Sequence, residues 1–221
     1  AARTPWRSLL GYASLDAEPA SWRDPLARLP AWVHGAVEGL DPRELRVACR
    51  QVERGINTPL ASSLGRLFDA AAALRGVRTR SSYEGQAAME LEALAGAAEG
   101  RALPIPVRKG GGGLRELDPV PLLRALAAAR AAGRSVEGCA ADFHESVAAA
   151  AVELARTLCA EASLEAVALG GGCFQNLRLL RTVQRGLEGA GLRVLRPRLL
   201  SPNDGAVSYG QAVVTAARLS H

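Results

Sequence analysis

The sequence has almost no lysine. Lys109 is the single lysine among 27 basic residues, and the others are arginines spread along the chain. Aromatic residues are also scarce, at 4% of the chain. A surface that binds nucleic acid favours basic side chains clustered and interleaved with aromatic ones, and the sequence has no such cluster. The net charge of +5 therefore does not indicate a nucleic-acid-binding protein.

Long apolar runs are missing too. None approaches the roughly 18 residues that a membrane-spanning helix needs. The chain does not open with a basic segment followed by an apolar one, as a signal peptide does. We therefore expect a cytoplasmic protein with no membrane partner. The chain begins AARTPW without an initiator Met, which predicts a piece of a longer protein.

The four cysteines form no recognisable metal or disulfide pattern. No two of them make a Cys-x-x-Cys pair, and no histidine stands at the spacing of a zinc ligand. Cys49, Cys139 and Cys159 lie among apolar residues of predicted helices, so we expect them in the core. The sequence also lacks a Gly-x-Ser-x-Gly motif, which disfavours hydrolytic catalysis of that kind.

Residues 1–40 are rich in helix breakers. Five of the twelve prolines lie within the first 42 positions, which predicts short helices and extended pieces. Large aromatic side chains on such a segment need a surface to pack on. We therefore expect residues 1–40 to form an arm that wraps this domain or a neighbour, and residues 41–221 to form the main domain. The arm carries all three tryptophans, Trp6, Trp22 and Trp32.

The sequence of the first half of the main domain predicts helices. Asp41 followed by Pro42 is typical of a helix start, Glu44 suits a capping box, and Gly55 is a good stop. Two further helices are expected over 62–75 and 86–98.

A different pattern follows residue 100. A hairpin is expected over 102–117, and two helices are expected over 119–132 and 135–160. Strands then alternate with single helices, which indicates parallel strands joined by right-handed crossovers and an α/β fold. The alternating elements are strand 166–169, helix 174–189, strand 192–195 and helix 205–219.

The first candidate site is GGGCFQN at 170–176. It joins a predicted strand to a predicted helix, where open α/β sheets bind their ligands. Glycines permit close approach to the backbone, and a helix N-terminus favours phosphate. The alternative is a plain strand-to-helix turn with Asn176 on the surface. No helix directly follows the glycines at 110–113, so they predict a hairpin tip instead.

The second candidate is Asp204, in SPNDG at 201–205. One interpretation makes Asp204 the N-cap of the last helix, with Gly205 as a permissive neighbour. The other makes its carboxylate a ligand for a metal or a phosphate site at the sheet edge. Because a carboxylate has several lone pairs, one side chain can serve both roles.

The third candidate is Asp69, followed by Gly85. Asp69 stands in an apolar stretch, where a carboxylate needs partners such as ribose hydroxyls or a helix end. Gly85 begins the next helix and permits close approach of a ligand. The alternative is that Asp69 caps a helix or pairs with an arginine. His144, beside Phe143 in mid-helix, is expected to be a packed core histidine.

Five segments together resemble one known family. Over roughly residues 44–219 the chain is similar to the carboxy-terminal part of the hydrogenase maturation carbamoyltransferases called HypF, and the opening PWR fits them as well. In chain order the segments are INTPLASSLGRLFDAAAAL, YEGQAAMELEALA, the Phe143-His144 helix, LGGGCFQN and SPNDGAVSYGQAVVTAA.

The resemblance implies a fold and a reaction. The fold is the second lobe of an actin-like ATPase with a helical insertion, related to tRNA threonylcarbamoyladenosine transferases and O-carbamoyltransferases. The implied ligands are ATP and carbamoyl-adenylate, which is made from carbamoyl phosphate. The implied acceptor is the C-terminal cysteine of a HypE-like partner protein, during synthesis of the cyanide ligands of nickel–iron hydrogenase.

The resemblance also implies residue roles. Asp69 and Gly85 match positions that contact ribose in the superfamily. Gly171, Gly172 and Asn176 match positions that contact phosphate and adenosine. The resemblance assigns no catalytic nucleophile to this chain.

Asp204 matches a metal-ligand aspartate of the family, for zinc, iron or magnesium. The family completes that site with a paired-histidine motif from the first lobe, which this chain lacks. The first lobe and the N-terminal modules are missing as well, so we expect the chain alone to lack the complete reaction. Relatives often have Ser and Val where this chain has Gly170 and Cys173, and neither change disturbs the predicted loop.

Two other interpretations stay open. One is the matching lobe of a small-molecule O-carbamoyltransferase, although SSLGRLFDA and FQN favour the hydrogenase branch. The other is a catalytically silent module that binds partners through its tryptophan-rich arm and has no nucleotide affinity.

Overall fold

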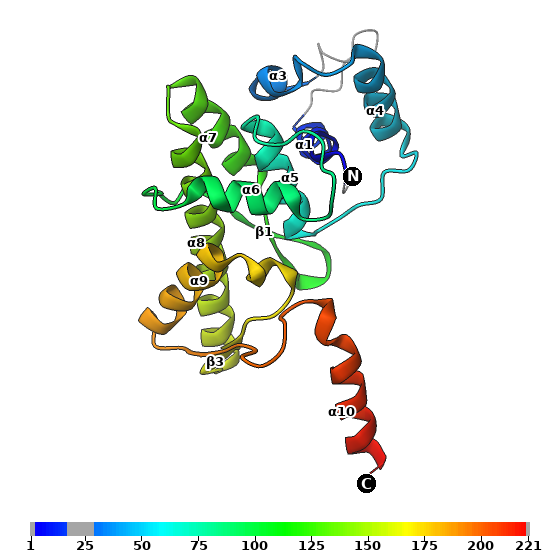
Figure 1. The fold of residues 1–221 in the computed structure, drawn as a ribbon. Helices are drawn as coiled ribbons and strands as arrows, with labels where there is room; N and C mark the ends of the chain where they lie inside the picture. The colour runs from blue at the N-terminus through cyan, green and yellow to red at the C-terminus, as the bar shows by residue number, and fades with distance from the viewer. Residues whose placement is uncertain (1–2, 17–28, 220–221) are drawn as a thin grey trace. The chain divides into compact units, whose positions relative to one another are not determined.

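The computed structural model describes residues 3–16 and 29–219, so Trp22 and His221 lie outside the described residues. The chain divides into two compact units, Ala1–Val147 and Ala148–His221 (Figure 1). The division into an arm at 1–40 and a domain at 41–221 stays a prediction. Among the described residues, the helices are too short or too polar to cross a membrane.

The first unit consists mainly of helices, and one antiparallel hairpin joins β1 to β2. A long helix, α8 (Val136–Ala162), begins in this unit and ends in the second. The other elements of the unit are α1 Pro5–Ser14, α3 Ala31–Val37, α4 Pro42–Arg54, α5 Leu64–Leu74, α6 Gln86–Ala95, β1 Val107–Lys109, the 3-10 turn Gly111–Gly113, β2 Arg115–Leu117 and α7 Val120–Ala131.

The core of this unit is built around α5. Every residue from Leu67 to Leu74 is buried, because α1 and α6 pack against α5 (Figure 1). Trp6 of α1 is fully buried, and the described part of the predicted arm therefore packs on its own chain. Cys49 and Cys139 are also buried in this unit, as predicted.

The predicted start of α4 is confirmed in part. The Asp41 carboxylate accepts a hydrogen bond from the Arg43 amide at 2.8 Å, and Gly55 ends the helix with a left-handed φ of 64°. The capping box is wrong, because Glu44 forms an ion pair with Arg80 instead.

The hairpin is shorter than predicted for a physical reason. The residues before β1 use their amides on α8, where Asp142 accepts from the Arg101 amide and Ser146 accepts from the Leu103 amide, both at 2.8 Å. Arg134 donates to the same fully buried carboxylate of Asp142. Strand pairing therefore begins only at Val107.

The second unit contains the predicted parallel pair of strands. Val167 of β3 is opposite Val194 of β4, and α9 packs against β4 with an apolar face that includes Val183 and Leu187. The elements are β3 Ala166–Ala168, the 3-10 turn Gly172–Gln175, α9 Leu177–Gly189, β4 Arg193–Leu195, the 3-10 turn Asp204–Ala206 and α10 Val207–Leu219. The α/β alternation read from the sequence is therefore confirmed.

Candidate functional site

Four of the six predicted site residues lie on two loops of the second unit. Gly171, Gly172 and Asn176 follow β3, and Asp204 follows β4. A hydrogen bond of 2.7 Å from the Gly171 amide to the Pro202 carbonyl joins the two loops. Since β3 and β4 are parallel, their carboxyl ends meet at one edge of the sheet, which is where such folds place ligands. The structure therefore brings these two loops together.

The glycine loop has one position whose backbone conformation favours glycine and one open amide. Gly171 has a φ of 94°, in the left-handed region that residues with a Cβ rarely adopt. The Gly172 amide has no partner among the described residues, and a Cβ at Gly172 would lie 3.9 Å from the Cβ of Asn203. An anion that reaches this loop finds the Gly172 amide available to donate to it.

Asn176 is the N-cap of α9. Its Oδ1 accepts a hydrogen bond from the Leu179 amide at 2.8 Å, and the side chain is buried. The interpretation that placed Asn176 on the surface is therefore wrong. The cap leaves one lone pair of Oδ1 for a second hydrogen bond, because an amide oxygen can accept two.

Replacing Asn176 tests how much its cap contributes to the stability of the chain. Asn176→Ala should lower the free energy of unfolding by about 1 kcal/mol, because α9 loses its cap. Asn176→Asp should leave the stability nearly unchanged, because aspartate caps as well as asparagine. Urea denaturation of the three proteins measures this, and equal stabilities of the alanine and wild-type proteins would show that the cap contributes nothing.

Asp204 is not the cap that the sequence suggested. Asn203 caps the turn instead, with its Oδ1 accepting from the Gly205 amide at 2.9 Å and from the Ser201 hydroxyl at 2.8 Å. Asp204 is exposed, and its carboxylate makes no hydrogen bond or ion pair with the described residues. Across 3–16 and 29–219, no group of three His, Cys, Asp or Glu side chains forms a metal site. Asp204 is therefore at most one ligand of a metal centre completed by other residues.

The other two predicted residues lie in the first unit. Asp69 on α5 is 4% exposed, and its Oδ2 lies 2.7 Å from Nη1 of Arg66, an ion pair without good hydrogen-bond geometry. The predicted alternative of an arginine partner is therefore confirmed. Burial raises the pKa of Asp69 to about 6, although the Arg66 charge opposes the shift. Burial also raises the pKa of the nearby Tyr12 hydroxyl. The Arg66 charge lowers this pKa, and the Asp69 charge raises it.

The raised pKa of Asp69 predicts a pH effect on stability. The carboxyl group binds its proton more tightly in the folded state than at its ordinary pKa of 3.8. Its contribution to the free energy of unfolding is therefore fully present below about pH 4 and is lost as the pH rises to about 6. Asp69→Asn removes this loss, so its melting temperature relative to wild type should rise between pH 4 and pH 7. A difference that stays constant over this range would contradict the raised pKa.

Gly85 stands directly before α6 with a left-handed φ of 79°. The Ser82 amide donates to Oε1 of Gln86 at 2.7 Å, which holds the loop before the helix. Apart from its own chain neighbours, no atom lies within 4 Å of the place where a Cβ at Gly85 would be. The predicted helix start is confirmed, and this glycine leaves open space for a neighbouring group.

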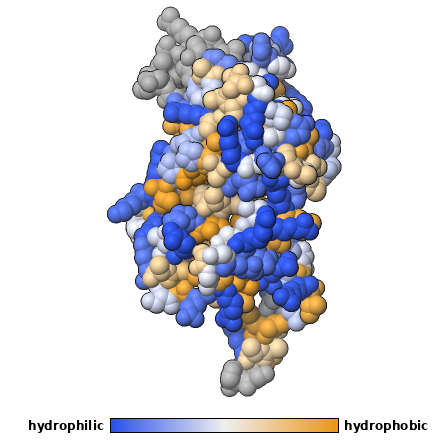
Figure 2. Space-filling model, turned by 90° about the vertical axis from the view of Figure 1, so that its left-hand side faces the viewer, coloured by the Kyte–Doolittle hydropathy of each residue, from blue (hydrophilic) through white to orange (hydrophobic). Residues whose placement is uncertain are grey.

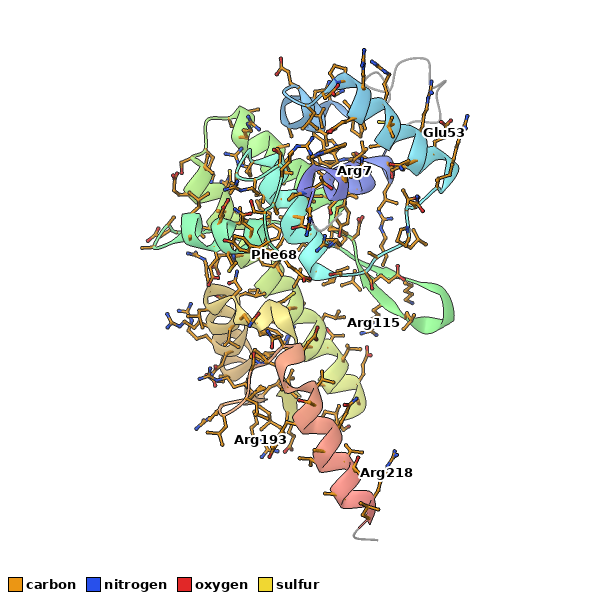
Figure 3. The ribbon with its side chains drawn as sticks, turned by 45° about the vertical axis from the view of Figure 1, so that its right-hand side comes forward. Arg7, Glu53, Phe68, Arg115, Arg193 and Arg218 are labelled. Atoms are coloured by element: carbon orange, nitrogen blue, oxygen red, sulfur yellow. The ribbon has the colours of Figure 1, made fainter. Side chains whose placement is uncertain are left out.

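Several other sequence interpretations have clear outcomes. The glycines at 110–113 form the exposed tip of the β1–β2 hairpin, near Arg115 in Figure 3. His144 is buried, and its Nδ1 lies 2.7 Å from the Ala140 carbonyl oxygen, as a packed histidine should. Cys159 is buried, and Cys173 is partly exposed beside the glycine loop.

Two supporting residues were missed by the sequence reasoning. Arg66 stands three positions before Asp69, a spacing that places oppositely charged side chains together on a helix, so this pair was readable. The other is Asn203. Asn203 and Asp204 could each cap the turn, and residue type does not predict which one is used, because both side chains are good caps.

The chain was compared with known proteins. The family described as "Carbamoyltransferase, Kae1-like Domain, second subdomain" matches residues 1–211. The carbamoyltransferase HypF of Rhodobacter capsulatus is 42% identical over 96% of this chain, and that of Rhizobium leguminosarum bv. viciae is 38% identical over 96%. The chain spans only 27% and 25% of these two relatives.

Two solved structures that resemble this chain are also of HypF proteins. A crystal structure of full-length HypF in the phosphate- and nucleotide-bound form matches all of this chain with a TM-score of 0.85 and 33% identity, over 27% of its own length. The structure of T. kodakarensis HypF matches 99% of this chain with a TM-score of 0.79 and 27% identity, over 28% of its own length.

Proposed function

The chain belongs to the family of Kae1-like carbamoyltransferase second subdomains, and from this membership we propose that it supplies the nucleotide-binding part of a carbamoyltransferase. The observation that carries the proposal is the pair of loops at the carboxyl ends of β3 and β4. They are joined through Gly171, and they leave the Gly172 amide without a partner among the described residues. The similar full-length HypF was solved with phosphate and nucleotide bound, which supports a nucleotide as the ligand.

Each predicted residue receives a role in this proposal. The Gly172 amide donates to a phosphate oxygen, and Gly171 holds the loop in the conformation that this requires. Asn176 fixes the start of α9 and contacts adenosine. Asp69 accepts hydrogen bonds from ribose hydroxyls, and Gly85 allows the ligand to approach the start of α6.

The proposed reaction is transfer of a carbamoyl group from carbamoyl-adenylate to a thiolate. The thiolate sulfur attacks the carbamoyl carbon, a C–S bond forms, and the bond from that carbon to the phosphate oxygen breaks. AMP leaves with the electron pair. Its phosphate gains negative charge in this step, and in this proposal the Gly172 amide stabilises that charge. The chain binds and orients the adenylate, and the nucleophile comes from the acceptor.

We also propose that Asp204 contributes one oxygen ligand to a divalent metal, zinc, iron or magnesium. Its exposed carboxylate, unused by the α10 turn, fits that role, and residues from outside this chain complete the site. Such a metal supplies charge stabilisation at the phosphate and acyl oxygens. The Asn203 cap orients the turn that presents Asp204.

The remaining proposals concern context. The acceptor is the C-terminal cysteine of a HypE-like protein, and the missing first lobe and N-terminal modules make the adenylate. We place the protein in the cytoplasm.

Mass spectrometry of the acceptor tests the proposed function. The chain, supplemented with the missing modules of a relative, is incubated with ATP, carbamoyl phosphate and a HypE-like protein. We expect the acceptor to gain one carbamoyl group, and a variant without its terminal cysteine to gain none. An unmodified acceptor beside a carbamoylated small-molecule hydroxyl would support the O-carbamoyltransferase instead. A chain that binds no nucleotide with the first lobe present would support the silent module.

A further inference from the structure

A buried arginine of the first unit lies beside the start of α8. Arg75 directly follows α5 and is only 6% exposed. Its Nη2 donates at 3.4 Å to the carbonyl of Arg134, two residues before α8 begins. Its Nε and Nη1 are buried and have no hydrogen-bond partner among the described residues. The guanidinium therefore faces the first turn of α8 with two unused donors.

No carboxylate compensates the charge of this arginine. None of the ion pairs within 3–16 and 29–219 includes Arg75. Burial lowers the pKa of Arg75, and the Arg130 charge lowers it further, whereas nearby Cys139 and Glu137 oppose the shift. An arginine nevertheless keeps its charge in proteins. Because a buried charge without a partner is costly, Arg75 indicates a counter-ion that comes from outside the chain.

A second arginine reaches the same place from α7. Nη1 of Arg130 donates to the Leu74 carbonyl at 2.9 Å, so its side chain contacts the end of α5 next to Arg75. The C-terminus of a helix favours cations, yet this carbonyl is used by Arg130 and not by Arg75. Arg130 is exposed, so its guanidinium can turn from Leu74 toward a ligand. Two neighbouring arginines without a carboxylate between them are typical of a site for an oxyanion.

The first turn of α8 supplies further donors. The Gly138 amide donates to Oγ of Ser135, and the Cys139 amide donates to the carbonyl of Ser135, both at 3.0 Å. The amides of Val136 and Glu137 have no partner among the described residues. Free amides at a helix start point along the positive end of the helix dipole and bind oxyanions. The unused donors of Arg75 and of the α8 start therefore require the same kind of ligand.

We infer that a small oxyanion of the phosphate class binds at the α8 anion site, which we define as Arg75, Arg130 and the amides of Val136 and Glu137. The anion supplies the charge that Arg75 lacks and accepts from the free amides. Figure 2 faces the side of the first unit on which Figure 1 shows α7, and hydrophilic side chains, in blue, lie there among apolar ones. A hydrated anion can approach such a surface. The glycine loop belongs to the second unit, so this inference does not depend on the proposed nucleotide site.

Amide NMR of the isotope-labelled chain, titrated with inorganic phosphate, tests this inference. The titration uses neither nucleotide nor the first subdomain, which is the lobe that this chain lacks. We expect the Val136 and Glu137 amides to shift and to reach saturation. Sodium chloride at the same ionic strength should cause no saturable shift of these amides. Phosphate should also raise the melting temperature of the chain more than chloride does.

Three variants locate the binding. Arg75→Leu should abolish the saturable shifts, and it should not lower the melting temperature in phosphate-free buffer, because it removes an unpaired buried charge. Arg130→Gln changes an exposed residue and should raise the Kd for phosphate about tenfold, because a charged hydrogen bond is lost. Arg46→Gln is the matched control, since Arg46 is exposed on α4, and it should change the Kd by less than about twofold.

Several results would overturn the inference. These are shifts that do not saturate, equal shifts with chloride, or a Kd unchanged by Arg130→Gln or by Arg75→Leu. If Arg75→Leu does not fold, the wild-type shifts and Arg130→Gln decide. The Gly172 amide reports separately on the proposed nucleotide site when ADP and the first subdomain are added, so failure at one site is distinguishable from failure at the other.

Discussion

Asp69→Ala should weaken binding of ADP by about tenfold or more when the chain is combined with the first subdomain. Hydrogen bonds between a charged group and ribose hydroxyls contribute about 1.5–3 kcal/mol, which corresponds to a factor of about ten to a hundred in Kd. The Asp69 carboxylate is buried in α5 and held by Arg66, so it is positioned before the nucleotide arrives. Isothermal titration calorimetry with ADP measures the change.

Two further variants show where the effect originates. Glu38→Ala removes an exposed carboxylate from the same unit and should leave the ADP affinity unchanged. Arg66→Gln removes the ion-pair partner of Asp69 but not the carboxylate, so its effect should be smaller than that of Asp69→Ala. Equal ADP affinities of wild type and Asp69→Ala would exclude Asp69 from the nucleotide site.

Phe143→Ala should destabilise the first unit by about 3–5 kcal/mol, the usual cost of truncating a buried phenylalanine. Phe143 is 1% exposed, and its ring packs edge-to-face on Phe68 of α5 with the centroids 4.8 Å apart. Asp69 directly follows Phe68 on α5, so this contact also supports the candidate site. Figure 3 labels Phe68 within the unit.

Urea denaturation followed by tryptophan fluorescence measures this loss, since Trp6 is buried in the same unit. Met89→Ala is the matched control. Met89 is 50% exposed on α6, and its truncation should change the stability by less than about 0.5 kcal/mol. A loss of under about 1 kcal/mol for Phe143→Ala would show that the aromatic cluster does not hold the unit together.

The sequence was most informative where local chemistry determines the structure. Helix α4 starts after Asp41 and ends at Gly55, as predicted. The alternation of strands and helices after residue 165 correctly predicted parallel strands. It also placed the glycine loop and Asp204 at strand ends, which the structure brings together through the hydrogen bond between Gly171 and Pro202. The helix ends and the order of strands and helices depend on neighbours a few residues apart, which a sequence displays directly.

The errors come from competition between similar residues and from distant partners. Asn203 and Asp204 are equally good caps, and only the folded turn shows that Asn203 is used. Glu44 could not be assigned to Arg80 from the sequence, because the two are 36 positions apart. The strand before Val107 was predicted too long, since its amides bond to side chains on α8 that lie far along the sequence.

Backbone NMR of the isotope-labelled chain, combined with unlabelled first subdomain and titrated with ADP, tests the central claim most directly. The claim is that the strand-end loops of the second unit bind the nucleotide. We expect the largest amide shifts at Gly171, Gly172 and Asn176. Shifts confined to the hairpin tip at 110–113, or no shifts at saturating ADP, would contradict it.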